Sequence, residues 1–298
     1  MSKRKELGDK VVDKDTVMDD ESGDDEDFDV LNVDFEWFDP QPEVDFHGIK
    51  TLLQQLFDVD AQLFDLSALT DLILSQPTLG STVKVDGNET DAYAFLSVLN
   101  LQQHKARVCA DIKEDEPYMG KIIQYLLSKS KSKSELAPIV ELLSQPTIPS
   151  IGLILTERLI NVPSEVVPPM YTMLQEEIQW AIEDKEPYNF SHYLILSKTY
   201  TEVASKLDAE DDRPKKKKKA AGGSFETMYF HPEDEVLHRH AICHGGYDYS
   251  TKQDDGYSDS KRAFQELGIK PQGHAILISA DKFKAAVEDI AEYLKPQA

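Results

Sequence analysis

The segment IGLILTERLINVPSEVVPPMYTMLQEEIQWAIEDKEPYNFSHYLILSKTY, residues 151–200, sets the fold class of this chain. Residues 151–155 form an apolar run typical of a buried strand, and residues 192–200 form a second one. Between them, apolar residues recur about one helical turn apart: Met170, Leu174, Ile178 and Ile182. This spacing predicts a long helix, which Ser164 can cap, and Pro168 and Pro169 suit only its first turn or the loop before it.

Elements of both kinds continue towards the N-terminus. Aromatic and β-branched residues predict a strand that begins near Phe28 and ends before Pro40. Apolar residues at three- and four-residue spacing then predict a helix over 46–57, with Asp45 as its N-cap, and a second helix over 66–73.

Two β-rich runs, 81–85 and 93–101, flank the turn signal Asp86-Gly87-Asn88 and predict a hairpin. Helical stripes follow over 118–127 and 136–143. Towards the C-terminus we expect strands over 228–230, 236–242 and 274–278, and a final helix that Asp281 caps. No period of 20 to 50 residues repeats. We therefore expect a single mixed α/β domain over residues 28–298.

Acidic residues dominate the charge of the chain. The 298 residues include 32 Lys and Arg against 55 Asp and Glu, which gives a formal net charge of -23. Such a field repels nucleic acid phosphates and anionic lipids. It favours a basic partner, such as a protein that must be kept from nucleic acid before assembly.

Just over half of the acidic excess, a net charge of -12, lies in residues 1–45, and we expect the first 27 residues to be a disordered tail. Its acidic side chains are candidates for docking a basic client, and a device for solubility is an equally good reading. The candidate docking residues are Asp19, Asp20, Glu21, Asp24, Asp25, Glu26 and Asp27.

Residues 208–224 show no apolar periodicity and predict a disordered, lysine-rich loop. Its five lysines follow Pro214 without interruption: Lys215, Lys216, Lys217, Lys218 and Lys219. A basic run of this kind indicates a nuclear import signal that an import receptor reads. The alternative is an ordinary solvated loop.

Neither a metal site nor a disulfide is expected. Cys109 and Cys243 are far apart and lack paired spacing, which fits a reducing compartment. If residues 236–244 are a strand, His238, His240 and His244 share one face and Cys243 lies on the other. This separation favours exposed or hydrogen-bonded histidines over a shared metal ion. The same interpretation applies to His231.

The sequence lacks the common catalytic and cofactor motifs. It contains no G-x-S-x-G elbow, Walker loop, G-x-G-x-x-G or H-E-x-x-H. We therefore expect no catalytic residues and no cofactor. The N-terminus has no apolar leader segment and no run approaches the ~18 residues of a membrane span, so we expect a soluble, intracellular protein.

Several motifs in order resemble the BCCIP family of eukaryotic nuclear proteins. They are FHGIKTLLQQLF (46–57), LTDLI (69–73), Gly80-Ser81, LTERLINVP (155–163) continuing to Pro169-Met170-Tyr171, and LSKTY (196–200). The resemblance runs from about residue 28 to the C-terminus. It implies a fold similar to the GNAT acetyltransferases without their activity.

The sequence agrees with the absence of that activity. GNAT enzymes hold the cofactor pyrophosphate on an Arg/Gln-x-x-Gly-x-Gly/Ala turn at a helix N-terminus. Here the strand over 151–155 leads instead through Thr156, Glu157 and Arg158 to a helix start that contains prolines. An acidic Glu157 where phosphates would lie discourages acetyl-CoA binding further.

The resemblance also implies a function. Fungal members act in nuclear export and ribosome assembly, which implies a nuclear protein that shuttles with the cytoplasm. It implies a chaperone for a basic large-subunit ribosomal protein, the one numbered fourteen in the universal naming. The alternatives are an adaptor for nuclear export of a phosphoinositide kinase or for genome-maintenance partners, and an acyl-CoA-dependent acetyltransferase.

Overall fold

The computed structural model describes residues 33–76, 79–103, 117–145, 150–202, 227–250 and 269–295. The predicted acidic tail and lysine-rich loop lie outside the described residues, as does Cys109. The residues from Asp34 onwards form one compact unit. No helix in the described ranges is long and apolar enough to span a bilayer.

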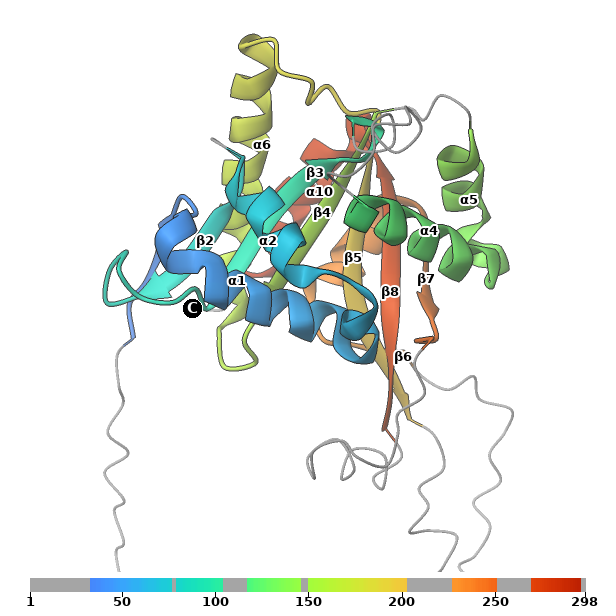
Figure 1. Cartoon of the computed structure of the whole chain (residues 1–298), viewed down its shortest axis with the longest axis horizontal. Helices are drawn as coiled ribbons and strands as arrows, with labels where there is room; N and C mark the ends of the chain where they lie inside the picture. Colours follow the sequence, from blue (N-terminus) through green and yellow to red (C-terminus); the bar gives the residue numbers. More distant parts are fainter. Residues whose placement is uncertain are drawn as a thin grey trace, which may run out of the picture. The chain divides into compact units, whose positions relative to one another are not determined.

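A single mixed sheet is the centre of the structure (Figure 1). Its order within the described residues is β1-β2-β3-β4-β5-β8-β7, and β6 pairs with β5 beside this path. The strands are β1 (Phe35–Phe38), β2 (Ser81–Val85), β3 (Ala94–Asn100), β4 (Ile151–Arg158), β5 (His192–Glu202), β6 (Thr227–Tyr229), β7 (Ala241–Tyr247) and β8 (Ile269–Ser279). All pairs are antiparallel except β4 with β5.

Helices cover both faces of the sheet. The α-helices are α1 (Pro42–Phe57), α2 (Leu66–Leu74), α4 (Pro117–Lys131), α5 (Ala137–Ser144), α6 (Val167–Glu183), α8 (Glu233–His240) and α10 (Ala280–Tyr293). Short 3-10 turns are η1 (Asp58–Leu63), η2 (Ser134–Leu136) and η3 (Ser164–Val166). One core contains residues of α1, α2, α4 and α5, and the other contains residues of α6, α8 and α10.

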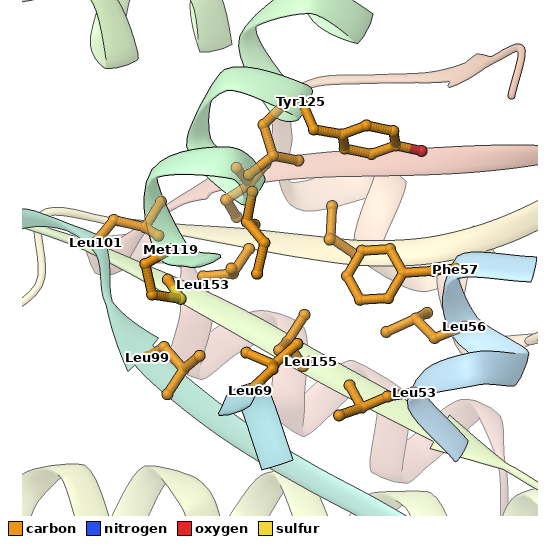
Figure 2. Packing of buried hydrophobic residues seen from close by; sticks show 14 of the residues in the cluster. Leu53, Leu56, Phe57, Leu69, Leu99, Leu101, Met119, Tyr125, Leu153 and Leu155 are labelled. Atoms are coloured by element: carbon orange, nitrogen blue, oxygen red, sulfur yellow. The ribbon is translucent and has the colours of Figure 1, made fainter. Parts of the chain in front are cut away.

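Alternating side chains of the central strands supply both cores. In β3, Phe95 and Leu99 lie in the first core, whereas Leu96 and Val98 lie in the second. Figure 2 shows the first core, where side chains of α1 meet Leu155 of β4 and residues of α2 and α4. Burial on both faces is the reason that these strands are continuous apolar runs in the sequence.

The segment 151–200 forms a parallel strand–helix–strand unit. Residues Ile151 to Leu155 pair in register with His192 to Leu196, and α6 connects the two strands. The predicted strands and helix are confirmed, but the predicted cap is wrong. Ser164 begins the 3-10 turn η3, and α6 begins at Val167 without a side-chain cap. The adjacent prolines stand in its first turn, where their missing N–H groups have no helical partner.

The predicted N-terminal elements are confirmed with one correction. The hairpin is present as β2 and β3, and the described part of the predicted first strand is β1. Asp45 is not the N-cap of α1, because the helix begins three residues earlier at Pro42. Its carboxylate instead accepts a hydrogen bond from the backbone N–H of Gln41, at 2.7 Å.

The largest error concerns residues 236–242, which were predicted as a strand. Residues up to His240 belong to α8, and β7 begins at Ala241. Three acidic residues in the first turn and Arg239 in the last turn complement the helix dipole, while Val236 and Leu237 are fully buried. A short apolar run of this kind does not distinguish strand from helix. Asp281 likewise lies inside the first turn of α10, whose N-cap is Ser279.

Candidate functional site

An acidic groove lies between the first turn of α1 and the connection from β2 to β3. Its volume is about 780 Å³. Four exposed carboxylates line it: Glu43, Asp86, Glu89 and Asp91. The other lining residues are apolar or uncharged: Val44, Val85, Thr90, Ala92, Tyr93 and Leu159. Among the described residues, the lining contains no lysine or arginine, so the groove is suited to a cationic ligand with some apolar surface.

A buried ion pair holds the two walls of this groove together. The Lys84 ammonium lies 2.8 Å from the Asp45 carboxylate, and both side chains are fully buried. The same ammonium donates to the backbone and side-chain oxygens of Asn88, at 2.8 and 2.9 Å. The sequence identifies this loop only as a turn. Its three acidic residues, Asp86, Glu89 and Asp91, lie within six positions, and only the fold brings Glu43 of α1 to the same groove.

A second site lies where β4 and β5 separate. Their parallel pairing ends at Leu155 and Leu196. Beyond this point, within the described ranges, β4 pairs only with β3, and β5 pairs with β8 and with β6. His231 and the first turn of α8 follow β6 in the chain. Their buried charged side chains lie beside the ends of β4 and β5, where these two strands diverge.

Four ionic or hydrogen-bonded contacts fill this region. The Glu157 carboxylate lies 2.6 Å from the Lys198 ammonium and 3.2 Å from Nε2 of His231. Arg158 forms a two-pronged pair with Glu233, at 2.5 and 3.2 Å. The Ser197 hydroxyl donates to Asp234 at 2.6 Å. We call Glu157, Arg158, Ser197, Lys198, His231, Glu233 and Asp234 the gap cluster.

The gap cluster shifts the pKa of its members. Burial raises the pKa of Asp234 to about 7, and the charge of Glu233 adds to this rise. Burial would also raise the pKa of Glu157, but His231 and then Lys198 outweigh it, and that pKa is lowered. Burial opposes the charged form of His231, yet Glu157, Glu233 and Asp234 raise its pKa. The paired charges of the cluster therefore stabilise one another, and the carboxyl of Asp234 titrates near neutral pH.

A third group consists of histidines. His238 of α8, His244 of β7 and His274 of β8 lie together, and their potential ligand nitrogens are all within 4.8 Å of one another. The prediction that His240 shares this face is wrong, because residues 233–240 are helical: His240 turns away and lies 2.7 Å from Asp289. His274, about 30 positions away in the chain, was missed because no sequence spacing connects it to the other two.

The other site residues predicted from the sequence lie in different parts of the chain. The acidic residues of the tail and Lys215 to Lys219 lie outside the described residues. His231 belongs to the gap cluster. Cys243 is a free, half-buried thiol whose pKa burial raises to about 11. A thiol in this state is a poor nucleophile at neutral pH.

The chain is similar to fungal proteins over nearly its whole length. Protein bcp1 of Aspergillus fumigatus is 64% identical over 300 residues, covering 99% of each chain. Protein bcp1 of Schizosaccharomyces pombe is 50% identical over 272 residues, covering 89% of this chain and 91% of the relative.

The fold and the family model agree with this similarity. The crystal structure of BCP1 from Saccharomyces cerevisiae matches with a TM-score of 0.58 and 26% identity, over 93% of this chain and 97% of that one. The BCCIP family model matches residues 30–237. The chain therefore belongs to the BCCIP family.

Proposed function

We propose that this protein is a non-enzymatic nuclear chaperone that binds a basic ribosomal protein of the large subunit, the one numbered fourteen in the universal naming. The observation that carries the proposal is the groove, whose lining in the described part of the chain has four exposed carboxylates and no cationic side chain. The net charge of -23 supports it, because such a field accelerates the encounter with a cationic client.

The groove supplies both kinds of contact that a client needs. Its carboxylates attract and orient lysine and arginine side chains, while Val44, Tyr93 and Leu159 offer apolar surface for slower dissociation. The contacts with exposed carboxylates weaken with salt and with competing polyanions. Ribosomal RNA would therefore displace the client at assembly, whereas the chaperone itself would be repelled by RNA.

The gap cluster supports the absence of acetyltransferase activity. We propose that the fold is GNAT-like, with β4 in the position of the strand that leads to the cofactor turn. The end of this strand carries Glu157, and Glu233 and Asp234 lie beside it. The cations at this place, Arg158, Lys198 and His231, are already paired with Glu157 and Glu233, so a pyrophosphate would have to compete with these carboxylates. In addition, the first turn of α6 contains two prolines that have no N–H to donate to a phosphate.

We further propose nuclear import through Lys215 to Lys219, read by an import receptor, with shuttling to the cytoplasm. The support is the uninterrupted basic run within an acidic chain. The seven acidic residues of the tail, Asp19 to Asp27, are proposed to add long-range attraction for the same client.

The test measures affinity of the full chain for the purified ribosomal protein by fluorescence anisotropy across a salt series. A groove variant carries Glu43→Gln, Asp86→Asn, Glu89→Gln and Asp91→Asn. A control neutralises four exposed carboxylates elsewhere: Glu176→Gln, Glu183→Gln, Asp184→Asn and Glu292→Gln. Both variants have the same net charge, so they separate a docking surface from a general field.

We expect wild-type affinity to fall steeply with salt, and the groove variant to bind at least about tenfold more weakly than the control. Equal affinities of the two variants would contradict docking in the groove. Failure of the wild-type chain to bind at low salt would contradict the proposed client. Micromolar binding of acetyl-CoA in a calorimetric titration would instead favour an enzyme.

A further inference from the structure

We propose that His238, His244 and His274 form a binding site for a divalent transition-metal ion, with Zn²⁺ as the ion of choice. The three imidazoles come from α8, β7 and β8 and lie outside both the acidic groove and the gap cluster. This site is independent of the proposed function, because none of the three residues lines the groove.

The spacing of the imidazoles fits a shared ion. Nitrogen ligands at about 2.0–2.1 Å from a tetrahedral Zn²⁺ are about 3.3 Å apart. Here Nε2 of His238 lies 2.8 Å from Nε2 of His274, and the ligand nitrogens of all three residues lie within 4.8 Å of one another. The required separation falls between these values, so modest side-chain rotations bring three ligands onto one ion.

The rings are grouped more closely than hydrogen bonding requires. His238 and His244 stack with ring centroids 3.7 Å apart and planes 9° from parallel. His274 is 2% exposed, and its Nδ1 has no hydrogen-bond partner among the described residues. A buried ring nitrogen without a partner is costly. When Nε2 of His274 binds an ion, its Nδ1 carries the ring proton, and an ordered water would accept that N–H.

The environment keeps these rings in the form that binds metals. Burial lowers the pKa of His238 to about 4 and that of His274 to about 3, and burial also lowers the pKa of His244. All three are therefore neutral near pH 7, and each ring has one nitrogen with a lone pair. The hydrogen bond between Nε2 of His238 and Nε2 of His274 needs an N–H on one of them, so that ring must carry its proton on Nδ1 before both Nε2 atoms bind one ion. Neutral imidazole is a ligand that suits Zn²⁺, Cu²⁺ and Ni²⁺, and not Mg²⁺ or Ca²⁺.

The site is open on one side and closed on the other. His244 is exposed, which gives an ion access and leaves a fourth position for water. On the other side His274 is buried, and the ring of Tyr229 packs edge-on against His238 and His274, with centroids at 5.1 and 5.9 Å.

The test is a calorimetric titration of the chelator-treated full chain with ZnCl₂. His244→Gln and the double variant His238→Gln/His244→Gln remove ligands from the surface side of the cluster. Two controls keep the cluster: His240→Gln changes a neighbour on the same helix, and His47→Gln changes an exposed histidine of α1. Far-UV circular dichroism verifies that each variant is folded.

We expect one tight Zn²⁺ per wild-type chain, unchanged in both controls. Loss of His244 should weaken binding by more than the ~10-fold that loss of an outer-shell partner costs, and the double variant should lose the tight site. In a parallel titration with Co²⁺, the visible absorption should be that of a four-coordinate ion with nitrogen ligands.

Two results of the Zn²⁺ titration would overturn the proposal. One is the absence of a stoichiometric Zn²⁺ site in the wild-type chain. The other is tight binding that persists unchanged in the double variant, since the ion would then be bound by other groups, such as the carboxylates of the tail. A Co²⁺ spectrum of octahedral type would overturn it as well, because it would show that the ion is bound by other groups.

Discussion

The carboxylate of Glu157 lies 2.6 Å from the ammonium of Lys198, and this contact joins β4 and β5 just beyond the last residues that pair between them. Both side chains are buried, and Lys198 also donates to the backbone oxygen of Gln55 on α1. The ion pair therefore connects the diverging strands to a helix on one face of the sheet. Its removal tests how much the gap cluster contributes to the fold.

Replacing Glu157 with Ala should destabilise the protein by about 3–5 kcal/mol, because Lys198 is left buried without a counter-charge. The measurement is urea unfolding followed by circular dichroism. The double variant Glu157→Leu/Lys198→Met removes both charges and should recover much of the loss. A single variant as stable as wild type would show that water reaches Lys198 and that the gap is not filled as described.

Asp234 should make stability depend on pH between about 4 and 7. Its ordinary pKa of 3.8 is raised to about 7 in the folded protein, so the folded state holds a proton that the unfolded state has released. The stabilisation from this proton is complete below pH 3.8 and is lost as the pH rises to about 7, with a slope of at most about 1.4 kcal/mol per pH unit.

The measurement compares unfolding free energies of wild type and Asp234→Asn at pH 5, 6 and 7. Asn retains an oxygen that accepts from the Ser197 hydroxyl, and the other titrating groups contribute to both proteins. The difference in unfolding free energy, wild type minus Asp234→Asn, should decrease as the pH rises. Glu288→Gln, which changes an exposed carboxylate, is the control and should show no such trend. A constant difference between wild type and Asp234→Asn would contradict the raised pKa.

Gly273 should not tolerate a side chain. A Cβ at this position would lie 2.3 Å from the ring of Tyr247, which is 3% exposed and packs against the ring of Tyr125. We expect Gly273→Ala to cost at least about 1–3 kcal/mol by overpacking.

The matched control is Gly246→Ala, on the neighbouring strand. Its added Cβ would lie 3.4 Å from the Thr199 hydroxyl, an ordinary contact, so its effect should stay within about 1 kcal/mol. Thermal unfolding of both variants gives the comparison. Equal melting temperatures would mean that Tyr247 moves aside without cost.

Changing the five lysines at 215–219 to Ala should move a fluorescent fusion of the full chain from the nucleus to the cytoplasm. The reason is that an import receptor reads an accessible run of basic side chains. The control changes five exposed lysines elsewhere, with the same effect on net charge: Lys131, Lys185, Lys282, Lys284 and Lys295. Nuclear accumulation that is equal in both variants would refute the import signal.

The sequence by itself determined the order of most helices and strands, because hydrophobic periodicity is a local property of the chain. The runs over 151–155 and 192–200 and the helix between them needed no tertiary information. The net charge likewise follows from composition, and it is the reason to expect a basic partner. The caps predicted at Asp45, Ser164 and Asp281 were wrong because α1, α6 and α10 begin without a side-chain cap, so a capping residue in the sequence does not mark where these helices start.

Only the tertiary structure decided what the charged and titratable side chains do. Val236 and Leu237 fix residues 233–240 as a helix by burying against the second core, and this turns His240 away from His238. The pairs Glu157 with Lys198 and His238 with His274 join residues 41 and 36 positions apart. Such contacts depend on which strands are neighbours in the sheet, and that order is set by burial over the whole chain and not by any local pattern.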